Sequence, residues 1–199
     1  QTQGDRLPAG ERERLLGSIV GEAGYLSTLT ENTLQLVRLA GTGIELRRDW
    51  ESVEEIVGTV LARVRRRDPA RRIGAQVPAA LPLVQGDAVL LAQLLGNLLD
   101  NALRYSDGPV DVAVRCETGE LWLCVKDRGP GLAGDGAAAG QPFARCDASG
   151  PHGAGLGLAV CRAIAQAHGG RLVLRQRGGG GTSACLVLPT EPQPAGAAP

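Results

Sequence analysis

Apolar residues recur at helical and strand-like spacings along most of the chain, and these spacings predict its elements. Between residues 11 and 40 the steps alternate four and three, which is the pattern of a coiled-coil seam. The seam comprises Leu15, Ile19, Leu26, Leu29, Leu36 and Ala40, with Glu22 and Thr33 in its gaps. Because one helix cannot bury such a seam alone, we expect a partner helix, either from a hairpin or from a second chain.

Residues 43–189 have the alternating pattern of one α/β domain. Ser52 and Glu55 form a capping box that opens a helix to about Arg66, and Asp87 caps a second helix that ends near Ser106. A third helix is predicted over 156–168. Strands are predicted over 44–48 and 71–77, with hairpins over 110–125 and 171–188. Residues 132–154 are rich in Gly and Ala and predict a long loop, and the ends, 1–10 and 190–199, predict disorder.

Composition narrows the classes of protein to consider. The 199 residues are 43% hydrophobic, and 21 basic residues balance 21 acidic ones, which argues against nucleic-acid binding by bulk charge. No apolar run is long enough to cross a membrane, and no signal peptide is recognisable. Since the chain begins with Gln and has no Met, we expect it to be a piece of a longer protein. The five cysteines, 116, 124, 146, 161 and 185, form no CxxC pair and favour buried free thiols over metal or disulfide roles.

The helix predicted after Asp87 has two chemically different faces. One face carries a core stripe of Leu91, Leu94, Leu95, Leu98 and Ala102, and the other carries Asn97, Asn101, Arg104 and Tyr105. An amide oxygen, a guanidinium and an aromatic ring suit a magnesium ion, a phosphate and a base. The alternative is an ordinary solvated or internally satisfied polar face.

Two glycine clusters follow this helix. Asp127-Arg-Gly129-Pro-Gly131-Leu132 comes directly after a predicted strand, where a carboxylate can accept a hydrogen bond from an exocyclic amine. An ordinary Asp-x-Gly turn is the alternative. Gly153-Ala-Gly155-Leu156-Gly157-Leu158 opens a helix, where backbone N–H groups can face phosphate. That cluster has neither the Walker pattern nor a Rossmann fingerprint.

The order of these motifs resembles one family. The asparagine helix, the Asp-x-Gly-x-Gly turn, Phe143-Ala-Arg145 and Gly-x-Gly-Leu-Gly-Leu are similar to the N, G1, F and G2 boxes of sensor histidine kinases. These kinases belong to the wider superfamily of Hsp90, type II gyrases and MutL. The resemblance implies the Bergerat ATP-binding fold, an α/β two-layer sandwich of a mixed sheet covered by helices, over 43–189.

The segment before this domain also resembles the family. Residues 11–42 are similar to the second helix of its dimerisation hairpin, whose first helix is absent here. The run from Leu81 to Leu91 most resembles the potassium-responsive, Kdp-type group, which would place the parent protein in potassium or osmotic signalling.

The resemblance implies an ATP site with Mg²⁺. Asn101 would ligate the ion with support from Asn97, and Arg104 would neutralise phosphate charge. Tyr105 would lie against the adenine, and Asp127 would accept a hydrogen bond from the adenine amine. The other members implied are Gly129, Gly131 and Leu132 of the adenine turn, Phe143 and Arg145 of the lid, Gly153, Gly155, Leu156, Gly157 and Leu158 at the phosphates, and Thr182.

The reaction that the resemblance implies is phosphoryl transfer. Superfamily ATPases carry a water-activating glutamate where Asn97 stands, and an amide cannot act as a general base. The full protein would move the ATP γ-phosphoryl to a histidine and then to an aspartate of a response regulator. The chain contains only two histidines, His152 and His168, and we expect structural roles for both. The phosphoacceptor histidine is therefore expected to be absent. The chain is therefore expected to bind ATP without phosphorylating itself.

Other functions stay open. Gly140 and Ala184 stand where the family often has aromatic residues, so a degenerate nucleotide-binding or interaction module without kinase activity is the main alternative. A serine kinase of the anti-sigma-factor kind and a superfamily ATPase are further ones. The partners implied are a response regulator, the missing dimerisation helix and, in the full protein, a second copy. The resemblance implies a cytoplasmic domain of an inner-membrane protein, attached through segments outside this chain.

Overall fold

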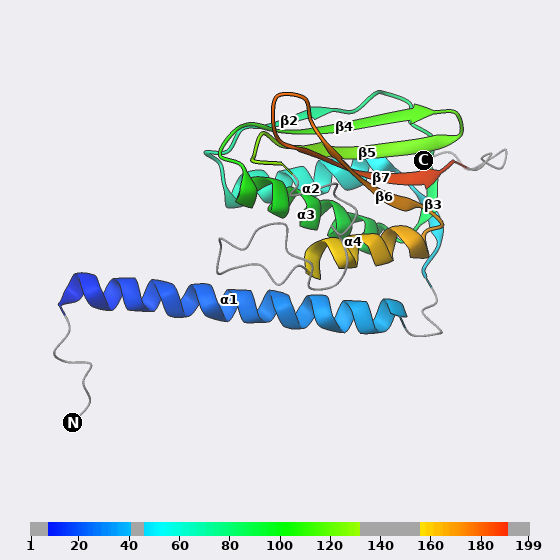
Figure 1. Ribbon diagram of the computed structural model, residues 1–199. Helices are drawn as coiled ribbons and strands as arrows, with labels where there is room; N and C mark the ends of the chain where they lie inside the picture. Colours follow the sequence, from blue (N-terminus) through cyan, green and yellow to red (C-terminus); the bar gives the residue numbers. More distant parts are fainter. Residues whose placement is uncertain (1–7, 41–45, 132–155, 191–199) are drawn as a thin grey trace.

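Three helices cover one face of a five-stranded mixed sheet in the computed structural model, which describes residues 8–40, 46–131 and 156–190 (Figure 1). The predicted two-layer α/β sandwich is therefore confirmed. The helices are α2 (Val53–Arg67), α3 (Ala88–Tyr105) and α4 (Leu156–Ala167). The strand order is β2-β4-β5-β7-β6, in which only β2 and β4 run parallel. These strands span Ile73–Gln76, Val110–Glu117, Glu120–Lys126, Thr182–Pro189 and Arg171–Gln176 in that order.

A small second sheet corrects the prediction of a strand over 44–48. Residues 46–48 are irregular, and the strand is β1 (Asp49–Glu51), which pairs antiparallel with β3 (Val84–Gly86). Residues 44 and 45 lie outside the described part of the chain. A three-residue strand forms where a partner is available, and no pattern in the sequence predicted β3. The partner therefore decided the position of the strand.

The predicted helix starts are confirmed by their caps. The Ser52 hydroxyl accepts a hydrogen bond from the Glu55 N–H at 3.3 Å, and Asp87 Oδ1 accepts from the N–H groups of Val89 and Leu90 at 3.0 and 3.2 Å. These bonds satisfy donors that a helix N-terminus cannot satisfy internally. The caps fix where α2 and α3 begin relative to the sheet.

The core lies between the inner face of the sheet and α2, α3 and α4. Every predicted core residue of α3 is buried, and Leu99 joins them. The inner side chains of the sheet alternate along each strand, as half-buried strands require. They include Val110, Val112, Val114, Leu121, Leu123, Val125, Leu186 and Leu188.

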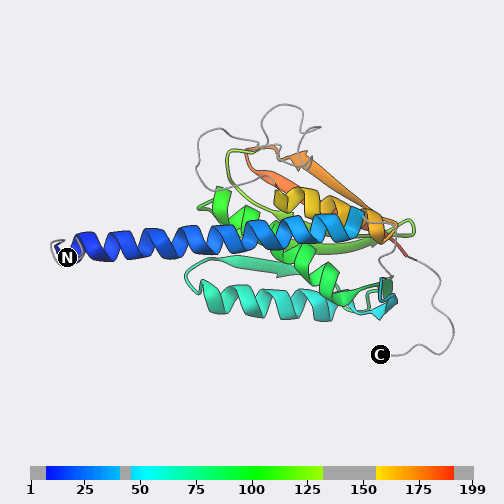
Figure 2. The ribbon, with the colours of Figure 1, turned by 90° about the horizontal axis from the view of Figure 1, so that it is seen from below.

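The N-terminal helix α1 (Ala9–Ala40) lies along α4 on the side away from the sheet, and its first half extends beyond the domain (Figures 1 and 2). Leu29 and Leu36 of the predicted seam are half-buried there, whereas Leu15 and Ile19 keep 47% and 62% exposure. The seam is thus covered only toward its end. No helix in the described residues combines the length and apolarity needed to span a membrane.

The preference for free thiols was wrong for one pair of cysteines. Cys124 of β5 and Cys185 of β7 are directly opposite each other in the sheet, with Cα atoms 4.0 Å apart, and form a disulfide. The strand pairing, which no Cys spacing reveals, brings them together. Cys116 is an exposed free thiol and Cys161 a buried one, and Cys146 lies outside the described residues.

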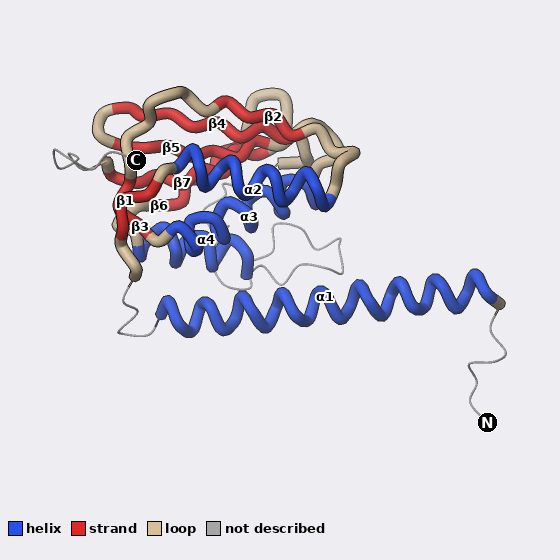
Figure 3. The backbone as a smooth tube through the Cα atoms, turned by 180° about the vertical axis from the view of Figure 1, so that it is seen from behind, coloured by secondary structure: helices blue, strands red, loops and turns tan. Residues whose placement is uncertain are grey.

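His168 joins the end of α4 to the start of α3. Its Nδ1 lies 2.8 Å from the Ile164 carbonyl oxygen and donates to it, since a carbonyl can only accept. Its Nε2 accepts a hydrogen bond from the Asp87 N–H at 3.0 Å. Both bonds require the neutral ring, and burial lowers the pKa of His168 below its usual value. The residue is 5% exposed, which agrees with the structural role expected for it. Figure 3 shows from behind how α3 and α4 lie next to each other.

We expect the free energy of unfolding to fall as the pH drops from about 7.5 to about 5.5. The unfolded chain binds a proton on residue 168 near the ordinary pKa of 6.5, whereas the folded protein resists protonation until lower pH. One such proton changes stability by at most about 1.4 kcal/mol per pH unit. Denaturant unfolding at several pH values measures the slope, part of which disappears in His168→Gln. His152→Gln is the matched control, and a slope lost in that variant instead contradicts the assignment.

Candidate functional site

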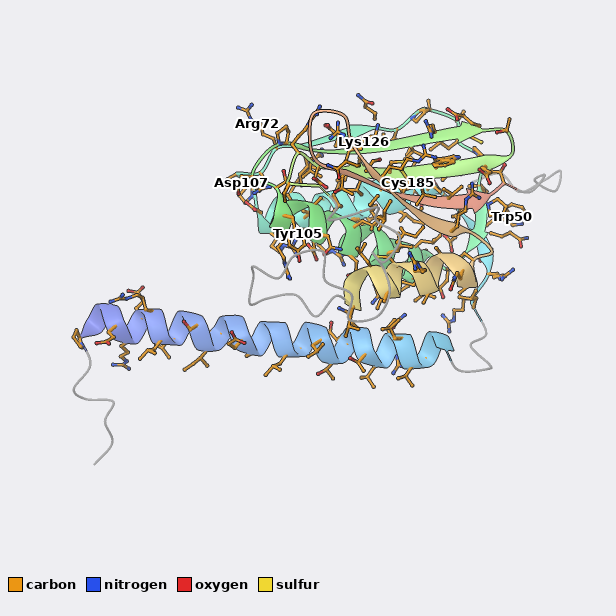
Figure 4. All side chains as sticks on the ribbon, viewed as in Figure 1. Trp50, Arg72, Tyr105, Asp107, Lys126 and Cys185 are labelled. Atoms are coloured by element: carbon orange, nitrogen blue, oxygen red, sulfur yellow. A yellow bond between two sulfur atoms is a disulfide. The ribbon has the colours of Figure 1, made fainter. Side chains whose placement is uncertain are left out.

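The polar stripe of α3 faces the start of α4. Asn97 and Asn101 are half-buried, while Arg104 and Tyr105 are exposed at the end of the helix (Figure 4). The place where Gly157 would carry a Cβ is 3.8 Å from Asn101 Nδ2. The first turn of α4, predicted to lie near phosphates, therefore meets the asparagine predicted to hold the ion.

Asn97 has an unusual environment for a surface amide. Its Nδ2 is buried and has no acceptor among the described residues. The nearby Cys161 thiol of α4 donates to the Leu94 carbonyl at 3.6 Å, and burial raises the pKa of Cys161 to about 12, so the thiol stays protonated. A buried amide N–H without an acceptor costs about 1–3 kcal/mol. The amide is thus suited to an acceptor oxygen supplied by a ligand.

Asp127 is fixed at the end of β5 by the backbone around it. Its side chain is 8% exposed, and Oδ1 accepts the N–H of Gly129 at 2.8 Å and of Thr182 at 3.1 Å. Its own N–H donates to the Thr182 carbonyl at 2.9 Å. Both hydrogen bonds that the described residues donate to the carboxylate end on Oδ1. The carboxylate is therefore oriented, and Oδ2 can accept from a ligand.

Close backbone approaches explain two of the glycines here. A Cβ on Gly129 would collide with the Tyr105 carbonyl, and one on Gly181 would collide with the carbonyl of Asp127. Gly181 also has a φ of +92°, which disfavours any side chain. The turn after β5 thus packs against the end of α3, so it is more than an ordinary Asp-x-Gly turn. This packing brings Tyr105 next to the Asp127 turn.

Three residues that the sequence analysis missed support this turn. Ser106 is 4% exposed, and its Oγ accepts the N–H groups of Gly108 and Arg128, each at 3.2 Å. Arg71 donates to the Ser106 carbonyl, and Arg177 Nη1 donates to the Asp127 carbonyl. A Ser-Asp-Gly sequence after a helix indicates a turn, which was a usable signal for Ser106. Nothing near Arg71 or Arg177 in sequence identified them.

The structure therefore brings together part of the predicted site. Asn97, Asn101, Tyr105, Asp127, Gly129, Gly157 and Thr182 lie along the contact of α3 with α4 and with the ends of β5 and β7. Leu156 is buried, Leu158 packs against the core, and Gly131 lies against Gln176. Five predicted members of the site lie outside the described residues, namely Leu132, Phe143, Arg145, Gly153 and Gly155. The loop predicted over 132–154 lies outside them as well.

The described residues contain no cluster of three or more His, Cys, Asp or Glu that could hold a metal. An ion here would be held by amide oxygen together with oxygens of the ligand. Mg²⁺ accepts this arrangement, since it commonly takes few protein ligands and completes its shell with phosphates and water.

Comparison with known proteins agrees with this geometry. Residues 86–192 match the family described as "Histidine kinase-, DNA gyrase B-, and HSP90-like ATPase". The chain is 34% identical over 172 residues to the sensor protein KdpD of Escherichia coli K12. The aligned region covers 83% of this chain and 19% of KdpD. The chain thus spans about a fifth of that relative.

Solved structures show the same arrangement. Full-length ShkA in complex with AMPPNP superposes with a TM-score of 0.74 at 28% identity, over 92% of this chain and 39% of ShkA. The mycobacterial sensor histidine kinase MprB superposes with a TM-score of 0.62 at 30% identity, over 73% of this chain and 99% of the solved one.

Two glycines offer a test of this packing. We expect Gly129→Ala to lower the free energy of unfolding by about 2 kcal/mol or more, because the new methyl group meets a backbone carbonyl. Gly157→Ala is the matched control, since its methyl group finds only van der Waals contact, and stability stays within about 1 kcal/mol. Denaturant unfolding of both variants measures the difference. Equal stabilities contradict the close approach of Gly129 to Tyr105.

Proposed function

Because the chain belongs to the family of histidine kinase-, DNA gyrase B- and HSP90-like ATPases, and within it resembles the catalytic domains of sensor histidine kinases, we propose that it binds Mg·ATP for phosphoryl transfer to histidine. The carboxylate of Asp127, held at the end of β5 by two backbone N–H groups, carries this proposal. An oriented, buried acceptor at that place suits the exocyclic amine of adenine.

The adenine would lie between Asp127 and Tyr105. Oδ2 of Asp127 accepts the amine, while the turn at Gly129 lets the base approach the backbone closely. Tyr105 is 52% exposed and offers its ring as a stacking surface. Thr182 positions the carboxylate through its N–H, so we assign it a positioning role on the adenine side.

The phosphates would lie between α3 and the first turn of α4. Asn101 supplies an amide oxygen for Mg²⁺, and the orphaned Asn97 Nδ2 donates to a phosphate oxygen. The N-terminus of α4 adds backbone N–H groups and a favourable dipole. When bound, the ion neutralises phosphate charge. Asn97 cannot activate water as a carboxylate could, which favours transfer over hydrolysis.

The acceptor and the partners are inferred from the relatives. His168 is buried and both of its ring nitrogens are bonded to backbone groups, so it is unsuited to receive a phosphoryl group. We propose that a histidine on a segment outside this chain, the missing dimerisation helix, receives it and passes it to a response regulator. The exposed first half of α1, with Leu15, Ile19 and Val20, would pack against a neighbouring helix in a homodimer.

The cellular setting follows the relatives as well. KdpD is named a sensor protein, and we propose that this chain is the cytoplasmic catalytic part of a membrane-bound sensor. A role in potassium or osmotic signalling is the narrower form of this proposal, supported by the likeness to KdpD.

We expect Asp127→Asn to weaken ADP binding by about tenfold or more. The amide keeps an oxygen for the N–H groups of Gly129 and Thr182, but it presents an N–H group toward the adenine amine. The hydrogen bond from the amine to the carboxylate, worth about 1.5–3 kcal/mol, is therefore lost. Calorimetric titration measures the affinity. Asp107→Asn, at an exposed carboxylate near the end of α3, is the matched control. Equal affinities for the two variants contradict the adenine site.

Asn101→Ala tests the metal site separately. We expect wild-type protein to bind a non-hydrolysable ATP analogue about five- to tenfold more tightly with Mg²⁺ than without it, and the variant to lose most of this gain. Affinity without Mg²⁺ should change little. If the variant keeps the full Mg²⁺ effect, Asn101 is not the ligand. If the folded wild-type chain binds no nucleotide at millimolar concentration, the alternative of an interaction module is favoured.

A further inference from the structure

The outer face of the sheet, turned away from the helices, carries a built cluster of side chains. The strand register places them in three rows. Cys124 and Cys185 lie in the middle row. One neighbouring row contains Asp111, Lys126, Ser183 and Arg175, and the other contains Arg115, Trp122, Val187 and Arg171. Figure 4 labels Lys126 and Cys185 in the sheet layer. None of these side chains takes part in the nucleotide site proposed above.

Positive charge gathers around the disulfide. The Trp122 ring has the guanidinium carbons of Arg115, Arg171 and Arg175 at 4.8, 5.7 and 5.7 Å from its centroid. Arg115 and Arg171 pair with Glu117 and Glu120. Among the described residues no ion pair joins Lys126 or Arg175 to a carboxylate, and Asp111 lies opposite Lys126 on β4. With four cations (Arg115, Lys126, Arg171 and Arg175) against three carboxylates (Asp111, Glu117 and Glu120), the face keeps one net positive charge.

A cavity of about 170 Å³ opens on this face, and the disulfide forms part of its lining. Arg115, Lys126 and Arg175 line it as well, with Ala113, Trp122 and Ser183. Cys124 and Cys185 are only 5% and 4% exposed, so the cavity is the route by which a reagent reaches them. Its size suits the thiol end of a small molecule rather than a protein surface.

We propose that Cys124–Cys185 is a thiol–disulfide exchange site that small anionic thiols reach through this cationic cavity. The attacking thiolate forms a bond to one protein sulfur, the Cys124–Cys185 bond breaks, and its electron pair leaves on the other sulfur. A second thiol then attacks the external sulfur of the mixed disulfide. Two small thiols are thereby oxidised to one disulfide, and the two cysteines are reduced and take up the two protons.

The surroundings favour one direction of attack. Ser183 Oγ is 3.5 Å from Cys185 Sγ, and since a disulfide sulfur has no hydrogen, the hydroxyl is the donor. It stabilises negative charge on Cys185 as the bond breaks. Cys185 is therefore the leaving sulfur, and the mixed disulfide forms on Cys124.

The crosslink joins the two strands that display the adenine carboxylate. Cys124 precedes Asp127 by three residues on β5, and Cys185 follows Thr182 by three on β7. The two strands end in the backbone bonds between Asp127 and Thr182. Reduction removes the covalent link and leaves only hydrogen bonds and packing to hold these strand ends. We infer that reduction weakens adenine binding about threefold or more, a consequence that rests on the proposed function.

The test measures exchange directly, with reduced glutathione as the anionic probe and 2-mercaptoethanol as the neutral one. Samples are quenched with acid, and alkylation with mass spectrometry follows the reduction of Cys124–Cys185 over time. We expect Lys126→Gln/Arg175→Gln to slow the glutathione reaction about tenfold and the neutral reaction less than about twofold. High salt should abolish the difference. The trapped glutathionyl group should map to Cys124.

Several outcomes overturn the proposal. Resistance of the disulfide to both thiols in the folded protein is one, and cysteines that stay as free thiols under oxidised glutathione are another. Equal slowing of the glutathione and 2-mercaptoethanol reactions in the double variant overturns it as well. A glutathionyl group on Cys185 overturns the assigned direction. ADP titration of the oxidised and reduced protein, with Cys124→Ser/Cys185→Ser as the redox-insensitive control, tests the coupling. Equal affinities overturn the coupling alone, whereas no binding by either form counts against the nucleotide site and leaves the exchange result standing.

Discussion

The hydrogen-bonded junction of Asp127 with Thr182 is the constraint on which the rest of the site depends. Two backbone N–H groups hold one carboxylate oxygen, so the side chain points in one direction before any ligand arrives. The glycines at 129 and 181 are required because carbonyl groups occupy the space that a side chain would need. A larger residue at 129 separates the turn from the end of α3, and one at 181 separates it from the start of β7. A preorganised acceptor of this kind costs little to use when a ligand binds.

The helix α3 serves the core and the site together, and its two faces have opposite requirements. Five of its leucines, Leu91, Leu94, Leu95, Leu98 and Leu99, are almost completely buried in the core, which fixes the rotation of the helix about its axis. That rotation points Asn97 and Asn101 along the contact with α4, where Gly157 leaves room. The unpaired Asn97 amide is a local cost of this arrangement, and His168 offsets part of it by tying α4 to the cap of α3. Stability and binding capacity are therefore built from the same packing.

The sheet also has two faces, with different chemistry on each. The inner residues complete the core, and the outer residues carry a disulfide, a tryptophan and several cations. Both faces belong to the same strands, so β5 and β7 connect the disulfide on the outer face with the strand ends at the proposed nucleotide site. The two cysteines are 61 residues apart in the sequence, and the chain between them contains the Asp127 turn, α4 and β6.

The sequence by itself determined the elements with strong periodicity or capping signals. The leucine spacing and the Asp87 cap predicted α3, alternation predicted the hairpin of β4 and β5, and the order of the motifs predicted the fold. These signals are local, because capping bonds and faces of a helix or strand depend on residues a few positions apart. Tertiary structure alone decided the rest. The pairing of β1 with β3, the Cys124–Cys185 bond and the supporting contacts of Arg71 and Arg177 join distant segments. Such contacts depend on strand order and register, which a single sequence does not encode in any local pattern.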